Sequence, residues 1–220
     1  MCFAPRGALP QHPAMLETKL IPAADGKSKR LMIVLHGLGD SMAGYTWVPE
    51  AMQFPWMNYL LVNAPDWYYG GYSWFDYPNN AEVGVLRSRQ LLNELLDAQR
   101  ANGFPTEQTV LGGFSQGCLM TLETGLRYPH RFAALIGLSG WVLDPATLLR
   151  EASAEGKETP VLVAHGRQDP LIPFDAVKQG MEQLKAGGIQ IDWHEFDMPH
   201  TIVEEEVRLI RRFLASVFAA

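Results

Sequence analysis

Six short apolar runs, spaced along almost the whole chain, most constrain what this protein can fold into. Each run is nearly continuous in apolar residues and ends at a small or turn-forming residue. The runs occupy residues 31–35, 59–62, 109–111, 132–138, 161–164 and 189–193. Uninterrupted apolar strands of this length are typical of a parallel sheet that is buried on both faces.

Amphipathic helical patterns fill the gaps between these runs. Residues 81–100 carry apolar side chains on one helical face, and residues 201–218 repeat them at steps of three and four. A capping-box pattern from Thr201 to Glu204 predicts the start of the last helix. Alternating strands and helices predict an α/β fold, with a mostly parallel central sheet and helices on both faces. In such sheets the functional site lies beyond the carboxyl ends of the strands.

The length and the net charge of the chain limit the number of domains and the classes of partner that can be expected. A chain of 220 residues without a linker-like tract predicts one domain over residues 1–220, with residues 1–14 as a poorly structured N-terminal arm. The 18 basic and 24 acidic side chains give a net charge of −6, which disfavours nucleic acid as a partner. No apolar stretch is long enough for a secretory signal or a membrane span. We therefore expect a cytoplasmic protein without integral membrane association.

The two cysteines, Cys2 and Cys118, predict neither a disulfide framework nor a metal site. Neither of them has another Cys or a His at metal-ligand spacing. Their small number fits a reducing compartment. Cys2, next to the initiator, carries only a weak signal for acylation.

A nucleophile-elbow motif lies where one of the predicted strands ends. Gly113-Phe114-Ser115-Gln116-Gly117 follows the run 109–111 and opens a helical pattern. A serine nucleophile requires this strand, turn and helix context, and glycines two residues before and after Ser115 leave room for the tight turn. The helix N-terminus behind Ser115 also offers unpaired N–H groups to a developing negative charge. The alternative is a glycine-rich turn with a chance serine.

A serine nucleophile needs a histidine base that is oriented by a carboxylate, and in this fold class both follow the serine in the chain. Three histidines stand well past Ser115. His200 lies in the loop between the last strand and the last helix, so we expect it to be the base. The alternatives are weaker, because His194 lies inside a strand pattern and His165 is better placed to support the loop after its own strand.

Asp169 is the expected orienting acid, because it lies on the loop after the penultimate strand, stiffened by Pro170 and Pro173. The competing carboxylates begin helices, lie within a strand or stand too close to His200 in sequence to reach around its ring. They are Asp144, Asp175, Asp192 and Asp197. The predicted catalytic residues are therefore Ser115, Asp169 and His200.

Two backbone N–H groups should stabilise the oxyanion of a tetrahedral intermediate. The segment His36-Gly37-Leu38-Gly39-Asp40 ends the first of the six runs, and we expect the N–H of Leu38 to be one donor. The residue after the nucleophile, Gln116, is the expected second donor. The alternative for residues 36–40 is a plain strand-ending turn.

Four segments, in this order along the chain, resemble the small carboxylesterase, lysophospholipase and acyl-protein thioesterase family. They are His-Gly-Leu-Gly-Asp (36–40), Gly-Phe-Ser-Gln-Gly (113–117), Gly-Arg-Gln-Asp-Pro-Leu-Ile-Pro (166–173) and Pro-His-Thr (199–201). The resemblance spans about residues 30–215 and implies an α/β-hydrolase fold with the triad and the oxyanion hole already named. Residues 73–76, Ser-Trp-Phe-Asp, are similar to an aromatic segment that flanks the site in this family.

The chain departs from the family pattern at three places. Cys118 and Pro199 stand where the family usually has glycine, and Pro199 should stiffen the histidine loop by fixing its backbone. Residues 40–47 also differ from the usual sequence after the oxyanion loop, so the resemblance does not predict the shape of the acyl pocket.

The aromatic segment 67–75 is dense for a surface loop, so several of its rings are expected to line an acyl groove or a subunit contact. Trp141, which follows another strand, is placed to close the other side of the site. The expected substrate-binding residues are Trp74, Phe75, Trp141 and Ile172.

Together these residues predict a serine carboxylesterase that hydrolyses carboxylic esters through an acyl-enzyme, with no cofactor or metal. An acyl-protein thioesterase or lysophospholipase is the alternative within the same chemistry. A non-catalytic binding module on the same scaffold is the alternative from another class. The expected partner is a small-molecule ester or acyl substrate, and the resemblance allows a homodimer. The strand and helix series leaves no stretch for a separate lid, so we expect an open site without interfacial activation.

Overall fold

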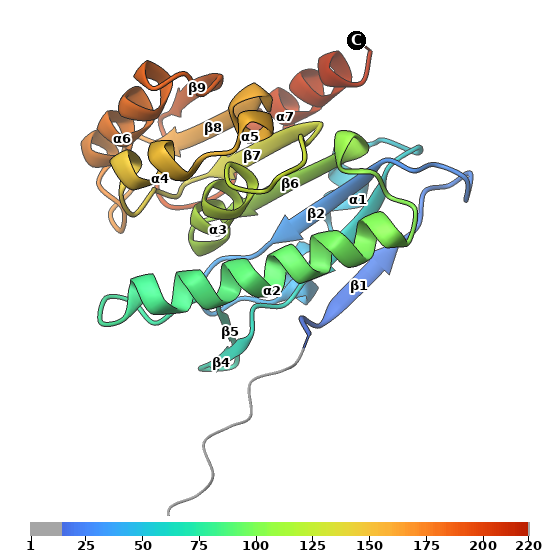
Figure 1. Ribbon diagram of the computed structural model, residues 1–220, viewed down its shortest axis with the longest axis horizontal. Helices are drawn as coiled ribbons and strands as arrows, with labels where there is room; N and C mark the ends of the chain where they lie inside the picture. The colour runs from blue at the N-terminus through green and yellow to red at the C-terminus, as the bar shows by residue number, and fades with distance from the viewer. Residues whose placement is uncertain (1–14, 220) are drawn as a thin grey trace, which may run out of the picture.

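A seven-stranded sheet runs through the centre of the protein, in a computed structural model that describes residues 15–219 (Figure 1). Its strands are β1 (Thr18–Ile21), β2 (Leu31–Leu35), β3 (Asn58–Val62), β6 (Thr109–Phe114), β7 (Ala134–Leu138), β8 (Val161–Gly166) and β9 (Ile191–Phe196). They lie in the order β1-β3-β2-β6-β7-β8-β9, and all neighbours are parallel except β1 and β3. Strands β4 (Asp66–Tyr68) and β5 (Gly71–Ser73) form a separate antiparallel hairpin. The predicted N-terminal arm, with Cys2, lies outside the described residues.

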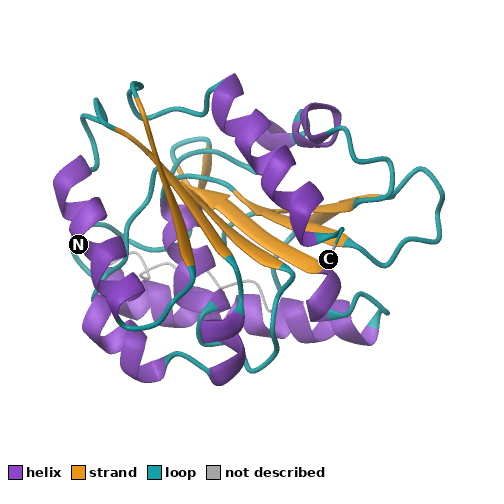
Figure 2. Ribbon diagram, turned by 90° about the horizontal axis from the view of Figure 1, so that it is seen from above, coloured by secondary structure: helices purple, strands orange, loops and turns teal. Residues whose placement is uncertain are grey.

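Helices cover both faces of this sheet (Figure 2). One core cluster joins a face of the sheet to α2 (Ala81–Ala101), α3 (Gln116–Gly125), α4 (Pro145–Glu151) and α6 (Phe174–Ala186). A second cluster joins the opposite face to η1 (Met42–Tyr45), α1 (Val48–Met52) and α7 (Glu204–Val217). The short helices η2 (Thr106–Gln108) and α5 (Ala154–Glu158) lie in connections. The predicted α/β fold, with a mostly parallel sheet between two helical layers, is confirmed.

Strand β2 shows why the apolar runs are continuous rather than alternating. Leu31, Ile33 and Leu35 belong to the core cluster on one face of the sheet. Met32 and Val34, between them, belong to the cluster on the other face. All five side chains are buried, as expected for a parallel sheet with both faces covered. Within residues 15–219, no helix is long and apolar enough to cross a membrane.

The last helix and the last strand both begin later in the chain than predicted. The last helix begins at Glu204 rather than Thr201, because its N-cap, Val203, has an extended backbone with φ of −110° and ψ of 161°. The Thr201 N–H donates to the Pro199 carbonyl at 2.9 Å, in a turn that precedes this N-cap. The last strand spans residues 191–196 instead of 189–193. The Ile189 N–H donates to the Leu184 carbonyl at the end of α6, which keeps Ile189 out of the strand.

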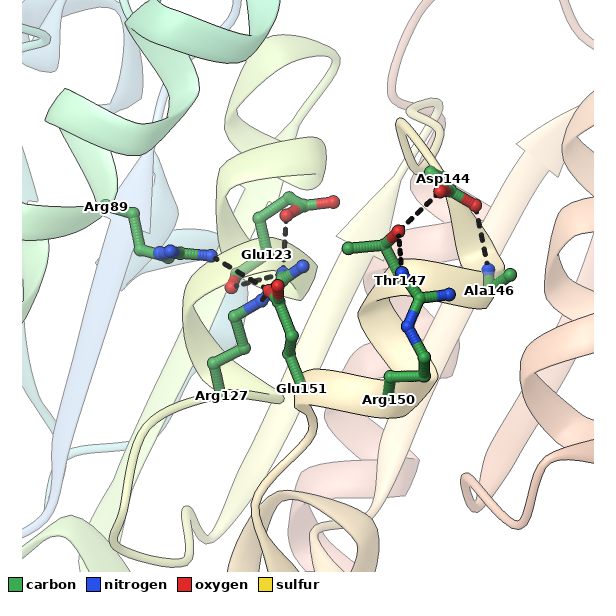
Figure 3. A network of polar contacts seen from close by, with 8 residues as sticks. All are labelled: Arg89, Glu123, Arg127, Asp144, Ala146, Thr147, Arg150 and Glu151. Atoms are coloured by element: carbon green, nitrogen blue, oxygen red, sulfur yellow. Dashed lines mark hydrogen bonds and ion pairs between the residues drawn. The ribbon is translucent and has the colours of Figure 1, made fainter.

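An ionic network ties together three of the helices on one face of the sheet (Figure 3). Arg127, two residues past the end of α3, binds Glu123 of α3 at 2.5 Å and Glu151 of α4 at 2.6 Å. Arg89 of α2 approaches the same Glu151 oxygen at 3.8 Å. Burial raises the pKa of Glu123, although its hydrogen bond to Arg127 opposes the rise. Removing Arg127 alone would leave Glu123 buried without its cation, which costs more than the pair itself contributes.

Candidate active site

The turn between β6 and α3 holds Ser115 in a backbone conformation that most side chains avoid. Ser115 has φ of 57° and ψ of −117°, and such a conformation costs about 1–3 kcal/mol. A Cβ on Gly113 would lie 2.4 Å from the Gly117 carbonyl carbon, and one on Gly117 would lie 2.2 Å from the Leu35 carbonyl oxygen. Both positions therefore require glycine. The Ser115 N–H donates to the Leu138 carbonyl of β7 at 2.9 Å, which anchors the turn to the sheet.

The loops after β8 and β9 bring Asp169 and His200 together. Asp169 Oδ2 lies 2.7 Å from His200 Nδ1, so the ring nitrogen donates to the carboxylate. Asp169 Oδ1 accepts from the backbone N–H groups of Leu171 and Ile172 at 2.9 and 3.0 Å. Burial alone would raise the pKa of Asp169, but the hydrogen bonds from His200, Ile172 and Leu171 outweigh it and hold the pKa below its usual value. The carboxylate is therefore ionised and fixes the orientation of the His200 ring.

His165 lies behind this pair and takes the supporting role that its position predicts. Its ring is fully buried, and Nε2 donates to the Ile172 carbonyl at 3.1 Å. Burial lowers the pKa of His165, so it stays neutral beside Asp169. His194 lies on β9, at the edge of the sheet, where Nε2 is 2.9 Å from Asp192 Oδ1. Neither histidine lines the cavity described below.

The turn after β2 packs closely against the side chains of Phe114 and Ser115. A Cβ on Gly37 would lie 3.3 Å from the Ser115 Cβ and 3.2 Å from Cδ1 of Phe114. The His36 ring anchors the start of the turn, because Nδ1 donates to the Gly37 carbonyl at 2.6 Å and Nε2 accepts from the Ala64 N–H at 3.0 Å. Burial lowers the pKa of His36, which agrees with a neutral ring that accepts at Nε2.

A cavity of about 410 Å³ collects most of the predicted site residues at the carboxyl ends of the strands. Its lining includes Leu38, Ser115, Gln116, Trp141, Ile172 and His200 from the predicted set, and also Gly37, Asp40, Tyr77, Phe114 and Leu171. Asp169 lies behind His200 with no exposed side-chain surface. A second cavity of about 310 Å³, between α4 and α6, shares four lining residues with the first. These are Tyr77, Trp141, Leu171 and Ile172.

Sequence reasoning missed two exposed residues at the mouth of the cavity. Tyr77 is 60% exposed and Leu171 is 70% exposed, so both can meet a bound molecule. Both residues lie close to a motif that the sequence analysis did identify. Tyr77 lies just past the aromatic segment, and Leu171 lies between Asp169 and Ile172 on the acid loop.

The prediction that Trp74 and Phe75 bind substrate is wrong for the structure as it stands, because both side chains have no exposed surface. The Trp74 indole is held inward, since its Nε1–H donates to the His36 carbonyl at 2.9 Å. Phe75 packs in the core cluster under α2. The exposed aromatic rings of this segment are instead on the β4–β5 hairpin, where Trp67 is 70% exposed and Tyr69 93% exposed.

The site offers nucleophilic chemistry rather than metal ligands. Within residues 15–219, no group of three His, Cys, Asp or Glu side chains is arranged to hold a metal ion. Burial raises the pKa of the Cys118 thiol to about 12, so this cysteine is not a thiolate at neutral pH. The cavity combines a serine on a strained turn, an imidazole bound to a buried carboxylate, and the two turns at residues 37–40 and 114–116 that line it beside the serine. Such a set suits acyl transfer.

Comparisons with known proteins point to the same chemistry. A family model described as phospholipase/carboxylesterase matches residues 16–218. The acyl-protein thioesterase 1 of Yarrowia lipolytica is 30% identical, in a match that covers 94% of this chain and 97% of that protein. The acyl-protein thioesterase 1 of Schizosaccharomyces pombe is 36% identical over 156 residues, which cover 64% of this chain and 69% of that protein. The crystal structure of esterase PE8 is similar with a TM-score of 0.85 and 29% identity, and covers 93% of this chain and 100% of that one.

Proposed function

Because this chain belongs to the phospholipase/carboxylesterase family, we propose that it hydrolyses carboxylic esters through an acyl-enzyme formed on Ser115. The protein is a serine hydrolase with an α/β-hydrolase fold. The observation that carries the assignment of residues is the hydrogen bond of 2.7 Å between Asp169 and His200, next to a cavity that contains Ser115. A buried carboxylate has this contact with a histidine when it orients a base.

In the proposed reaction, Ser115 Oγ attacks the carbonyl carbon of the ester while its proton passes to His200. The Nδ1 of His200 is occupied by Asp169, so Nε2 is the nitrogen that accepts the proton. The tetrahedral intermediate then collapses, the C–O bond to the alcohol breaks, and His200 returns the proton to the leaving oxygen. Water repeats the same steps on the acyl-enzyme and releases the acid.

The oxyanion of each tetrahedral intermediate would be stabilised by the N–H groups of Leu38 and Gln116. Gln116 is the first residue of α3, where backbone N–H groups have no partner within the helix. Leu38 lies in the turn that packs against Ser115 and lines the same cavity. Each such donor is worth about 2.7–4 kcal/mol of transition-state stabilisation.

The apolar path between α4 and α6 would hold the acyl chain. Trp141 and Ile172 line both cavities, so a chain attached at Ser115 can continue from the first cavity into the second. This path favours a second candidate within the same chemistry, an acyl-protein thioesterase or lysophospholipase with a long acyl group, and relatives of the chain carry the name acyl-protein thioesterase. A homodimer and a cytoplasmic location stay predictions.

Replacing Ser115 with Ala tests the nucleophile. We expect Ser115→Ala to lose turnover of a p-nitrophenyl ester and labelling by a fluorophosphonate probe, with an unchanged melting temperature. Ser139→Ala is the matched control, because Ser139 also has a positive φ, of 47°, directly after the neighbouring strand β7. Residual burst acylation in Ser115→Ala would contradict the assignment. A folded wild-type protein that the probe does not label would support the binding module instead.

The acyl path predicts how rates depend on chain length. Esters and thioesters with acyl chains of increasing length should be hydrolysed with rising kcat/KM as the chain fills the second cavity. Trp141→Ala should reduce this dependence more than it reduces the rate on an acetyl ester, because Trp141 lines both cavities. If chains beyond about eight carbons bring no further gain, the long-chain thioesterase or lysophospholipase assignment is wrong and the short-chain esterase stands.

A further inference from the structure

We propose that residues 71–75, and Trp74 above all, form a positioning segment that holds the two oxyanion donors in place relative to each other. The inference rests on the proposed function, since it concerns the same oxyanion hole. Trp74 has no exposed surface, so it acts through other residues and does not touch the substrate. Its contacts reach both turns from which Leu38 and Gln116 would donate.

The 71–75 segment is bonded to the Leu38 turn on both sides of Leu38. Before Leu38, the His36 carbonyl accepts from the Trp74 indole N–H at 2.9 Å. After Leu38, the Gly39 N–H donates to the Tyr72 carbonyl at 2.9 Å, and the Tyr72 N–H donates to the Asp40 carbonyl at 2.8 Å. These three bonds leave the peptide of Leu38 little freedom to rotate.

The contact between the two backbones is also too close for any other residue at position 71. A Cβ on Gly71 would lie 2.1 Å from the Gly39 carbonyl oxygen, and the isolated bridge between Asp40 and Tyr72 extends the same contact. The start of the segment is therefore packed directly on the oxyanion turn.

The same segment fixes Gln116, from the other side of the site. Gln116 is 2% exposed, and its side-chain oxygen accepts from the Trp74 backbone N–H at 3.0 Å. Its side-chain nitrogen donates to the Phe75 carbonyl at 3.0 Å, and the Ser73 hydroxyl lies 3.3 Å from the same side-chain oxygen. Both the oxygen and the nitrogen of the Gln116 side-chain amide are thus hydrogen-bonded, which fixes this residue at the start of α3.

Trp74 is the residue that joins the two donors. Its ring binds the Leu38 turn, its backbone N–H binds Gln116, and its carbonyl accepts from the Ser88 hydroxyl of α2. An oxyanion hole stabilises charge only when its donors already point at the place where the charge develops. A misplacement of about 1 Å at a reacting group can cost about 100-fold in rate. The Trp74 contacts set the spacing that the two donors need.

The experiment compares Trp74→Phe with Trp56→Phe. Phenylalanine keeps an aromatic ring in the core but removes the indole donor to His36. Trp56 is a partly buried tryptophan that packs on Phe54 and Phe218 and lines neither of the two cavities described above. We expect Trp74→Phe to lower kcat on a p-nitrophenyl ester by about 10- to 100-fold, with KM within about twofold of the wild type. Trp56→Phe should match the wild type in both constants.

Affinity for phenylboronic acid separates a positioning role from a merely structural one. The boronate forms a tetrahedral adduct on Ser115 whose oxygen occupies the oxyanion hole, so its Kd should rise in Trp74→Phe by about the factor that kcat falls. A lower melting temperature with unchanged kcat and boronate Kd in the folded enzyme would overturn the inference. If Trp74→Phe does not fold, Ser88→Ala carries the test with the same readouts and an expected loss of about threefold, and no loss there overturns it.

The failure of this inference differs from the failure of the proposed function. If the wild type hydrolyses the ester, Ser115→Ala does not, and Trp74→Phe behaves as the wild type, only the role of Trp74 is wrong. If the wild type has no turnover, or Ser115→Ala retains it, the proposed function itself is wrong.

Discussion

The buried carboxyl group of Glu206 should lower the free energy of unfolding at neutral pH, and one substitution at this position should remove that loss. It lies in the first turn of α7, next to the His200 loop, and has no exposed surface. One carboxyl oxygen accepts from the Val203 N–H at 3.1 Å, and the other has no hydrogen-bond partner. A buried carboxylate with a single donor is poorly compensated for its lost hydration, so folding favours the protonated form.

The magnitude follows from the pKa. Burial raises the pKa of Glu206 from 4.5 to about 7, against the opposing hydrogen bond from Val203. Between these two values the folded state keeps a proton that the unfolded state has lost, so stability falls as pH rises through this range. Above pH 7 the full cost is present, about 3 kcal/mol at 1.36 kcal/mol per pKa unit. Most of that cost, about 2–3 kcal/mol, should appear between pH 5 and pH 8.

Urea unfolding of the wild type and Glu206→Gln at pH 5 and pH 8 measures this cost. The change in free energy of unfolding between the two pH values should be more negative in the wild type than in Glu206→Gln by about 2–3 kcal/mol. Glu205→Gln is the control, because Glu205 is the preceding residue and its side chain is 63% exposed, so its variant should follow the wild type. Equal pH dependence in the wild type and Glu206→Gln would refute the reasoning.

The remaining predictions concern the catalytic loops. Asp169→Asn should lower kcat by about 10³- to 10⁴-fold with little change in KM, because the amide no longer holds His200 as a donor at Nδ1. Steady-state kinetics measures this change, and a loss of kcat below about tenfold would argue against the orienting role of Asp169. Gly113→Ala should lower kcat/KM at least about 100-fold, since its Cβ would lie 2.4 Å from the Gly117 backbone and must displace the nucleophile turn. Gly112→Ala, on the same strand, would meet the Ile136 Cβ at 3.3 Å and should keep activity within a few-fold; equal losses in the two variants would contradict this account.

The features that could be predicted from the sequence are those that depend on short segments. The apolar runs predict the strands because both faces of the sheet are covered, and the glycines around Ser115 predict the nucleophile turn because backbone atoms fill the space beside them. The orientation of Trp74 could not be predicted in this way. Its indole is held inward by a hydrogen bond to the His36 carbonyl, 38 residues earlier in the chain. The sequence of a dense aromatic segment does not show whether its rings face solvent or the core.

The contact between Asp169 and His200 depends on how strands β8 and β9 pair, and this pairing explains why residue 166 is a glycine. Parallel pairing sets Gly166, at the end of β8, opposite Phe196, at the end of β9, so the two loops leave the sheet at the same level. A Cβ on Gly166 would lie 2.2 Å from the Met198 carbonyl, which means that the loops touch through their backbones at this point. Any larger residue at position 166 would push the His200 loop away from Asp169. The glycine at the start of Gly-Arg-Gln-Asp is therefore a determinant of the acid and base distance, although it stands three residues before the acid.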